Sequence, residues 1–274
     1  MRKFLDKTTG YFTVKVIMGF LVWFYFRVVH RRGVEIIGKG NIPRSGKVLF
    51  YANHPSMVDP IIISCLFFPR CIFRPGLWPP FTLAAAENFF PNDCRDIPWL
   101  KKIPYIRDSR LFAWLMRHAN TLPVREGRED PYVLRSAKRK LRAGSNVFIF
   151  PEGVRTKNGV LDEFKEGVAF LAMSAKKIIP IWIEGSEKVF PKGKDRPQWS
   201  GNKITIMVGE PLKSLKIGWW HSLWLFFVAK LLFFVTKKEK REELIQKMDK
   251  KKRAEQTKKI REELLKLRPK KISK

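Results

Sequence analysis

The strongest structural signal in the sequence is the run Lys47-Val48-Leu49-Phe50-Tyr51-Ala52-Asn53-His54-Pro55-Ser56-Met57-Val58-Asp59-Pro60. Its first half is apolar and rich in residues that favour strands, and it ends abruptly at a polar corner. Apolar residues resume directly afterwards with Ile61-Ile62-Ile63. The pattern predicts a buried strand, a tight turn that carries a histidine and a carboxylate, and the start of a helix.

The histidine and the carboxylate of this corner can work together only if the chain bends between them. On one continuous α-helix, His54 and Asp59 would lie roughly 140° apart around the axis. Pro55 disfavours helix at the residue before it and fixes its own φ, which favours a bend. A carboxylate beside a histidine fixes the tautomer and supports a general base. A structural alternative also fits, because Ser56 and Asp59 match a capping box and Pro60 the first helical position.

The composition limits the class of protein. With 274 residues and 45% hydrophobic content, the chain has room for one large α/β domain, or for one domain with appendages, and is not generally disordered. It has 55 Lys and Arg against 25 Asp and Glu, a net charge of +30. Such a charge indicates an anionic partner, which is a nucleic acid, an acidic protein or a membrane with anionic lipid. The 9 Trp and 22 Phe suit a membrane interface as well as a core.

The cysteines predict neither a metal site nor a disulfide framework. Cys65, Cys71 and Cys94 form no C-x-x-C pair, and no histidine stands at ligand spacing. Their odd number and apolar surroundings indicate reduced thiols in the cytosol.

Between residues 34 and 212, strand-like and helix-like segments alternate. The expected strands are Val48–Ala52, Thr121–Arg125, Asn146–Phe150, Ile178–Ile183 and Lys203–Val208. The expected helices are Pro60–Phe68, Tyr132–Arg142 and Lys165–Lys177, and Ala84–Asn88 is expected to be a helix or the approach to one. This alternation predicts an α/β domain with a mixed, largely parallel sheet flanked by helices.

Three segments outside this domain favour a membrane. Residues 1–33 hold an eleven-residue uncharged run, Val16 to Phe26, between basic flanks. Because a span needs about 20 apolar residues, we expect a helix in the membrane interface, with a core helix as the alternative. Residues 213–236 are aromatic and apolar but interrupted by Lys230, which favours an interfacial or re-entrant segment over a span. Residues 237–274 carry 17 Lys or Arg and 7 Asp or Glu, and we expect a solvated basic helix or a partly disordered tail there.

A second candidate site follows the strand Asn146–Phe150, at Pro151-Glu152-Gly153-Val154-Arg155-Thr156-Lys157. Strand ends that turn through a glycine are common ligand sites in α/β proteins. Arg155 can hold a phosphate with two parallel bonds, and Lys157 adds a point charge. Glu152 could accept a bond from a substrate hydroxyl or hold Arg155. Upstream, a short strand likewise ends in an arginine, Arg125.

Together the two sites resemble the glycerolipid acyltransferases, best known from the 1-acylglycerol-3-phosphate O-acyltransferases. The resemblance rests on Asn53-His54-Pro55-Ser56-Met57-Val58-Asp59, a His-x4-Asp motif, and on Phe150-Pro151-Glu152-Gly153-Val154-Arg155-Thr156. Arg125 stands where the second block has an arginine, and Ile178-Ile179-Pro180-Ile181 fits the fourth block. Val154 stands where threonine is commoner.

The resemblance implies transfer of a fatty acyl group from acyl-CoA or acyl carrier protein to the sn-2 hydroxyl of 1-acylglycerol-3-phosphate, giving phosphatidic acid. It implies His54 as the base, Asp59 as its orienting group, and no metal or other cofactor. The substrate-binding residues would be Arg125, Glu152, Gly153, Arg155, Thr156 and Lys157. We expect lysophosphatidate and anionic membrane lipids as partners, no nucleic acid, and a place on the cytoplasmic face of the cell membrane.

Two alternatives stay open at this point. The acceptor could be another lysophospholipid or glycerol-3-phosphate. The chain could also be a non-catalytic basic protein that binds membranes or nucleic acid. Against nucleic acid, the sequence has no recognisable motif, and its aromatic residues sit in long apolar stretches.

Overall fold

The computed structural model describes residues 20, 24, 33–44, 46–67, 80–85, 120–124, 130–156, 160–190, 203–213 and 238–269. The predicted interfacial helix lies almost wholly outside these residues, and so does all of the aromatic segment 213–236 except Lys213. Their membrane roles therefore stay predictions. Within the described ranges, no helix combines the length and the apolar character that a membrane crossing requires.

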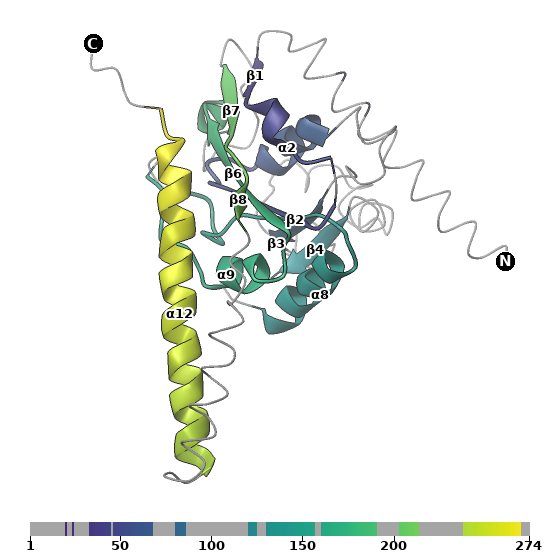
Figure 1. Ribbon diagram of the computed structural model, residues 1–274. Coiled ribbons are helices and arrows are strands. Elements are labelled where there is room, and N and C mark those ends of the chain that lie inside the picture. Colours follow the sequence, from purple (N-terminus) through teal and green to yellow (C-terminus); the bar gives the residue numbers. More distant parts are fainter. Residues whose placement is uncertain are drawn as a thin grey trace, which may run out of the picture.

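One sheet of eight strands organises the domain (Figure 1). Its strands are β1 (Val34–Ile37), β2 (Val48–Ala52), β3 (Phe81–Ala85), β4 (Thr121–Val124), β5 (Val147–Ile149), β6 (Lys177–Glu184), β7 (Ile204–Val208) and β8 (Leu212–Lys213). The order across the sheet is β1-β7-β6-β2-β5-β3-β4, and β8 also pairs with β6. Pairing is parallel throughout except where β7 and β8 meet β6. The predicted mixed, largely parallel α/β sheet is thus confirmed.

Strand β2 lies at the centre and places both candidate sites. It pairs in parallel with β6 on one side and β5 on the other, and every residue of it is buried. A strand buried on both faces is apolar throughout, which is why Val48–Ala52 shows no polar alternation. Because parallel strands end at the same edge, the segments after β2 and β5 lie side by side there.

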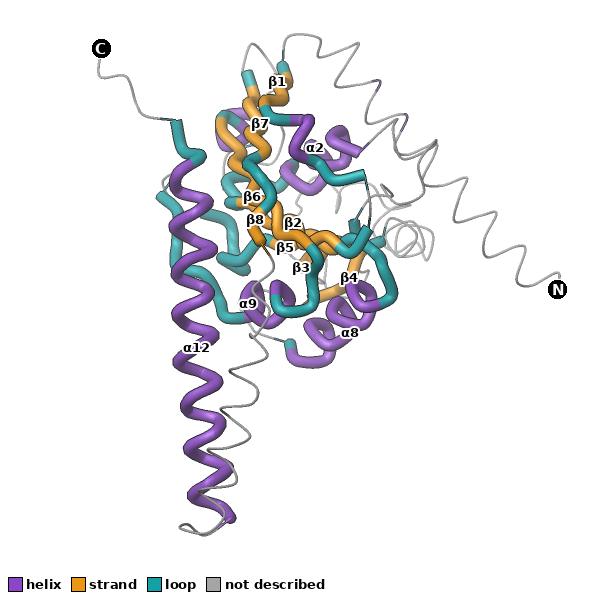
Figure 2. The backbone as a smooth tube through the Cα atoms, viewed as in Figure 1, coloured by secondary structure: helices purple, strands orange, loops and turns teal. Residues whose placement is uncertain are grey.

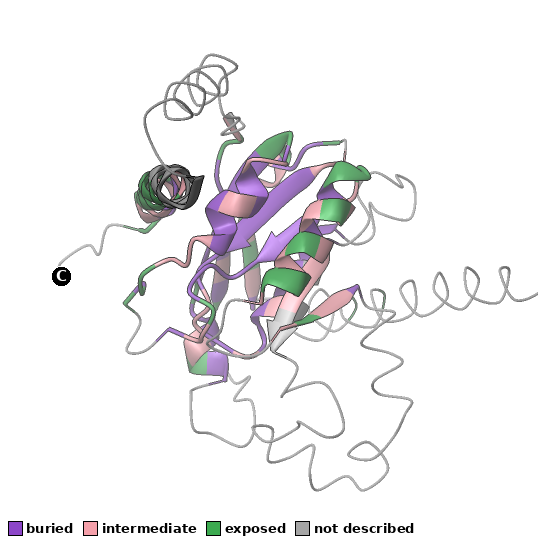
Figure 3. Cartoon of the chain, turned by 90° about the horizontal axis from the view of Figure 1, so that it is seen from below, coloured by how far each residue is buried: buried purple, intermediate pink, exposed green. Residues whose placement is uncertain are grey.

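Helices cover both faces of the sheet (Figures 2 and 3). They are α2 (Asp59–Phe67), α8 (Pro131–Arg142), α9 (Gly167–Ala172), α10 (Ser186–Val189) and α12 (Lys238–Lys266), with a short 3-10 helix at Lys39–Asn41. On β2, Phe50 packs in the same core cluster as α2 and α10. Leu49 and Tyr51 point to the other cluster, with α8, α9 and the end of α12. The period of two along the strand therefore separates two cores.

Helix α12 runs along one side of the domain and extends beyond the sheet (Figure 1). Its later turns are part of the core, since Ile260 and Leu264 are buried in the cluster around β2. The Tyr51 hydroxyl donates a hydrogen bond to the Ile260 carbonyl at 3.0 Å. Burial, with a smaller contribution from Glu263, raises the pKa of the Tyr51 phenol. The expected helix is present, but this part of it is packed in the core and not solvated.

Two predicted helices differ from the structure. Ala84 and Ala85, expected in a helix or its approach, belong to β3, which pairs with β4 and β5. Ala84 pairs with Pro123 and Ala85 with Val124 of β4, and this pairing outweighs the helical preference of alanine. The helix expected at Lys165–Lys177 is shorter, from Gly167 to Ala172.

Candidate active site

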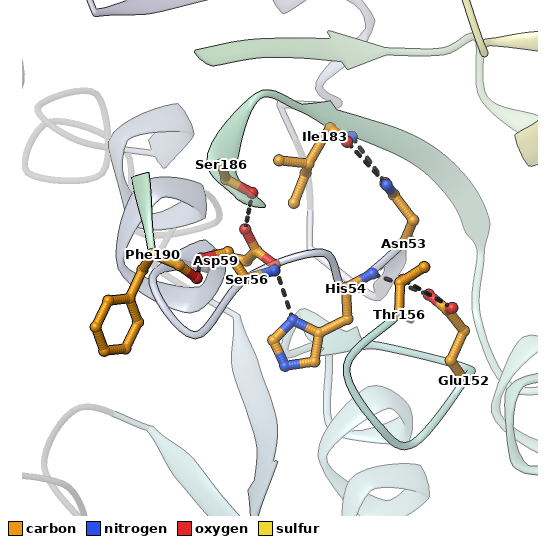
Figure 4. A network of polar contacts seen from close by, with 9 residues as sticks. All are labelled: Asn53, His54, Ser56, Asp59, Glu152, Thr156, Ile183, Ser186 and Phe190. Carbon is orange, nitrogen blue, oxygen red and sulfur yellow. Dashed lines mark hydrogen bonds and ion pairs between the residues drawn. The ribbon is translucent and has the colours of Figure 1, made fainter. Parts of the chain in front are cut away.

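The predicted bend brings His54 and Asp59 together (Figure 4). His54 follows β2 by two residues and Asp59 begins α2, so Pro55 separates the strand from the helix. The Nδ1 atom of His54 lies 2.8 Å from Oδ2 of Asp59. The ring stacks on Phe150, with centroids 4.0 Å apart and planes at 16°. The histidine side chain is 18% exposed and the aspartate 0%, so one nitrogen is fixed inside while Nε2 is left for a substrate.

The Asp59 carboxylate is held by three groups. Besides His54, Oδ2 accepts a bond from the Ser56 backbone N–H at 2.7 Å. Oδ1 accepts a bond from the Ser186 hydroxyl at 2.6 Å. A buried carboxylate needs such partners, and together they fix its orientation. The capping interpretation is thus half right: Ser56 donates to Asp59 through its backbone, while its hydroxyl bonds the Phe190 carbonyl.

Ser186 was not predicted from the sequence. It is fully buried at the start of α10, directly after β6, and 127 positions separate it from Asp59. Gly185 before it has φ 86°, and a Cβ there would lie 2.2 Å from the Lys203 carbonyl oxygen. The signal that could have revealed it is Glu184-Gly185-Ser186, a strand end that turns through a glycine as Glu152-Gly153 does.

Asn53 joins the end of β2 to β6. Its amide donates to the Ile183 carbonyl at 2.8 Å and accepts from the Ile183 N–H at 2.7 Å. These paired bonds replace the backbone ladder at the point where β2 ends. They hold the histidine corner beside the segment that carries Ser186.

Glu152 fastens the second site to the first. Its side chain is buried, and Oε1 accepts a bond from the His54 N–H at 2.9 Å. Oε2 accepts bonds from the Thr156 hydroxyl at 2.9 Å and the Asp162 N–H at 3.0 Å. The Thr156 N–H in turn donates to the His54 carbonyl at 2.8 Å. These contacts give Glu152 and Thr156 a positioning function, and their predicted substrate contacts stay predictions.

The exposed side of the turn carries Gly153 and Arg155. Gly153 has φ 70°, a backbone conformation that glycine adopts without strain. Arg155 is half-buried, and its guanidinium makes no ion pair or hydrogen bond with another residue in the described ranges. Arg125 and Lys157 lie outside those ranges, so their predicted roles stay predictions.

Neither a cysteine nucleophile nor a metal cluster is found in the described part of the chain. Cys65 is buried in α2, and burial raises the pKa of its thiol to about 12, which keeps it protonated. No group of three or more His, Cys, Asp or Glu side chains in those ranges could hold a metal ion. The case for His54 as a base rests on its contact with Asp59, and its catalytic role stays a prediction.

The fold and the histidine–aspartate pair define an α/β protein with its site at the carboxyl edge of a parallel sheet. The chain belongs to the Acyltransferase family, whose model matches residues 33–184.

Curated relatives carry one common name. A chloroplastic 1-acyl-sn-glycerol-3-phosphate acyltransferase of Arabidopsis thaliana is 28% identical over 109 residues, 39% of this chain and 30% of that protein. A 1-acyl-sn-glycerol-3-phosphate acyltransferase of Chlamydomonas reinhardtii is 29% identical over 181 residues, 65% of this chain and 46% of that protein. One of Bacillus subtilis is 23% identical over 186 residues, 66% of this chain and 75% of that protein. The chain thus spans under half the length of the first two.

A looser likeness links the chain to a solved structure. The crystal structure of the 1-acyl-sn-glycerophosphate acyltransferase PlsC from Thermotoga maritima is 20% identical, with a TM-score of 0.48. The likeness covers 93% of this chain and 83% of that one.

Proposed function

We propose that the protein transfers a fatty acyl group from an acyl thioester to the sn-2 hydroxyl of 1-acylglycerol-3-phosphate, giving phosphatidic acid. The observation that carries the proposal is the 2.8 Å contact between His54 and a buried Asp59, with the Glu152–Thr156 turn bonded to the same histidine. The names of the relatives support the choice of reaction and acceptor.

In this mechanism, His54 is the general base. Its Nε2 accepts the proton of the acceptor hydroxyl while that oxygen attacks the thioester carbonyl. The imidazolium that forms is stabilised by Asp59 behind Nδ1. When the carbon–sulfur bond breaks, the imidazolium returns the proton to the departing thiolate. A well-placed base contributes about 10²–10⁴-fold to such a step.

Arg155 has the role of binding the acceptor phosphate. A guanidinium forms two parallel charge-assisted bonds with phosphate oxygens, and Arg155 has no carboxylate partner in the described residues. The turn that carries it is bonded to both backbone groups of His54. Phosphate and base would therefore be held at a fixed separation, which aligns the hydroxyl with the base.

The site would work at the cytoplasmic surface of a membrane. Exposed lysines on α12, such as Lys247, Lys250 and Lys251, would face anionic headgroups together with the basic residues around 1–33. Each such charge near an anionic leaflet adds about 1 kcal/mol of attraction. The donor, acyl-CoA or acyl carrier protein, needs no resident metal or cofactor in this scheme.

Purified full-length protein in detergent tests the proposal. Glycerol-3-phosphate, 1-acylglycerol-3-phosphate and several lysophospholipids are offered as acceptors, each with acyl-CoA and with acyl carrier protein as donor. We expect transfer to 1-acylglycerol-3-phosphate, its abolition in His54→Ala, and unchanged binding of that variant to anionic vesicles. Transfer by a folded His54→Ala protein would overturn the mechanism, and a preference for another acceptor would overturn the substrate.

A further inference from the structure

A short segment after the second site lies across the Glu152 turn. We call residues Leu161–Glu166 the strap. Its Leu161 is buried, and the Asp162 N–H donates to the Glu152 carboxylate at 3.0 Å. The Lys165 N–H donates to the Pro151 carbonyl at 2.9 Å. The strap is therefore attached to the turn from the inside at two points.

Helix α12 holds the strap from the outside. Arg261 donates from Nε to the Asp162 carbonyl at 3.1 Å and from Nη2 to the Leu161 carbonyl at 3.0 Å. Arg253 pairs with the Glu166 carboxylate at 3.3 Å. Since the later turns of α12 are anchored in the core, the strap has a fixed path. This path determines where its lysine lies.

The side chain of Lys165 lies flat against Gly153. A Cβ added to that glycine would lie 2.9 Å from Nζ of Lys165, 3.0 Å from its Cε and 3.2 Å from its Cδ. The Lys165 ammonium therefore lies against Gly153, which precedes Arg155 by two residues. A larger residue at position 153 would displace the end of this lysine from the turn.

The charge of Lys165 has no acidic partner in the described part of the chain. Two glutamates flank it in sequence, yet Glu166 is engaged by Arg253, and no ion pair forms between Lys165 and Glu163. Arg155 is unpaired among the described residues as well. The Lys165 ammonium lies against Gly153, two residues from Arg155, and two cations near one turn repel each other unless an anion lies beside them. A phosphate group, with three acceptor oxygens and up to two negative charges, meets this need.

We propose that Lys165 is a second ligand of the acceptor phosphate, acting beside Arg155; this assignment rests on the proposed function. Arg155 supplies the planar pair of donors and Lys165 a point charge. Because the strap is held by Glu152, Pro151 and Arg261, the lysine backbone is already placed before the substrate arrives. Less freedom is then lost on binding.

The test compares Lys165→Met and Lys165→Arg with the wild type in detergent micelles. Initial rates are measured against 1-acylglycerol-3-phosphate at saturating donor, and against donor at saturating acceptor. Glycerol-3-phosphate serves as a headgroup probe by isothermal titration. We expect Lys165→Met to raise the acceptor KM and weaken probe binding about 10- to 100-fold, with the donor KM within about twofold. Lys165→Arg retains most of the affinity.

The matched control is Lys176→Met, which removes the same charge from an exposed lysine just before β6, at the opposite edge of the sheet. It should behave as wild type in every measurement. A folded Lys165→Met protein with unchanged acceptor KM and unchanged probe affinity would overturn the assignment, as would an equal rise in both KM values. If the wild type transfers no acyl group to 1-acylglycerol-3-phosphate, the proposed function fails. Titration with glycerol-3-phosphate would then still test whether Lys165 binds a phosphate group.

Discussion

Replacing Glu152 with glutamine separates a positioning function from substrate binding. The amide keeps the shape of the carboxylate but has only one acceptor oxygen. In the structure, the His54 N–H bonds one oxygen and the Asp162 N–H bonds the other. The Thr156 hydroxyl can rotate to accept a bond. Whichever way the amide turns, one of the two backbone N–H groups faces another donor.

The expected loss in the free energy of unfolding follows from the bonds that the amide cannot make. One charge-assisted bond is lost and one partly buried donor is left unpaired, which together cost about 2–3 kcal/mol. In a urea titration monitored by tryptophan fluorescence, the midpoint should fall by about 1 M. The value of kcat/KM should fall as well, since the turn is no longer fixed to His54. Glu163→Gln, an exposed neighbour on the strap, should change stability by less than about 0.5 kcal/mol. If Glu152→Gln loses activity while unfolding at the wild-type midpoint, Glu152 contacts the substrate and its positioning function is refuted.

Three further perturbations test other parts of the structure. Ser186→Ala removes the hydroxyl bond to Asp59, so kcat/KM should fall about 10- to 100-fold, and the unfolding midpoint should fall as well because one oxygen of a buried carboxylate loses its partner; undiminished kcat/KM would contradict the positioning role. Leu264→Ala should lower the free energy of unfolding by about 2–5 kcal/mol because this side chain is fully buried, and a loss below about 0.5 kcal/mol in a urea titration would show that the helix end is not core. Cys65 should resist iodoacetamide at pH 8 in the folded protein and react after unfolding in urea, measured by peptide mass spectrometry, because burial raises its pKa to about 12. Labelling of the folded protein at the unfolded rate would contradict that environment.

The sequence predicted the parts of the site that depend on neighbouring residues. Val48–Ala52 is a strand with the predicted limits, and the bend at Pro55 brings His54 to Asp59. Both follow from local patterns: apolar content for the strand, and the restricted backbone at proline for the corner. The helix at Tyr132–Arg142 was predicted for the same reason and begins one residue earlier, at Pro131.

The partners that come from distant strands could not be predicted. The Glu152 carboxylate was expected at a substrate hydroxyl or at Arg155, yet it bonds the backbone of a residue 98 positions earlier. Ser186 reaches Asp59 only because β6 pairs with β2 in a particular register. Likewise, nothing local in the sequence of α12 indicated that Tyr51 would bond the helix. Register across a sheet is set by the whole core.

The order of the strands has a consequence for how the chain folds. Val34 pairs with Ile204, and the hydroxyl of Tyr51 bonds a carbonyl 209 positions later. The central strand β2 is therefore synthesised early. The pairing of β1 with β7, and the contact of Tyr51 with α12, can form only after residues 204–208 and 260–264 have been synthesised. Contacts this remote in sequence slow folding, and they leave the apolar faces of the sheet uncovered in the meantime. The contacts of the histidine corner need the chain only as far as Phe190, so the corner can assemble before the edge strand and the outer helix close the two cores.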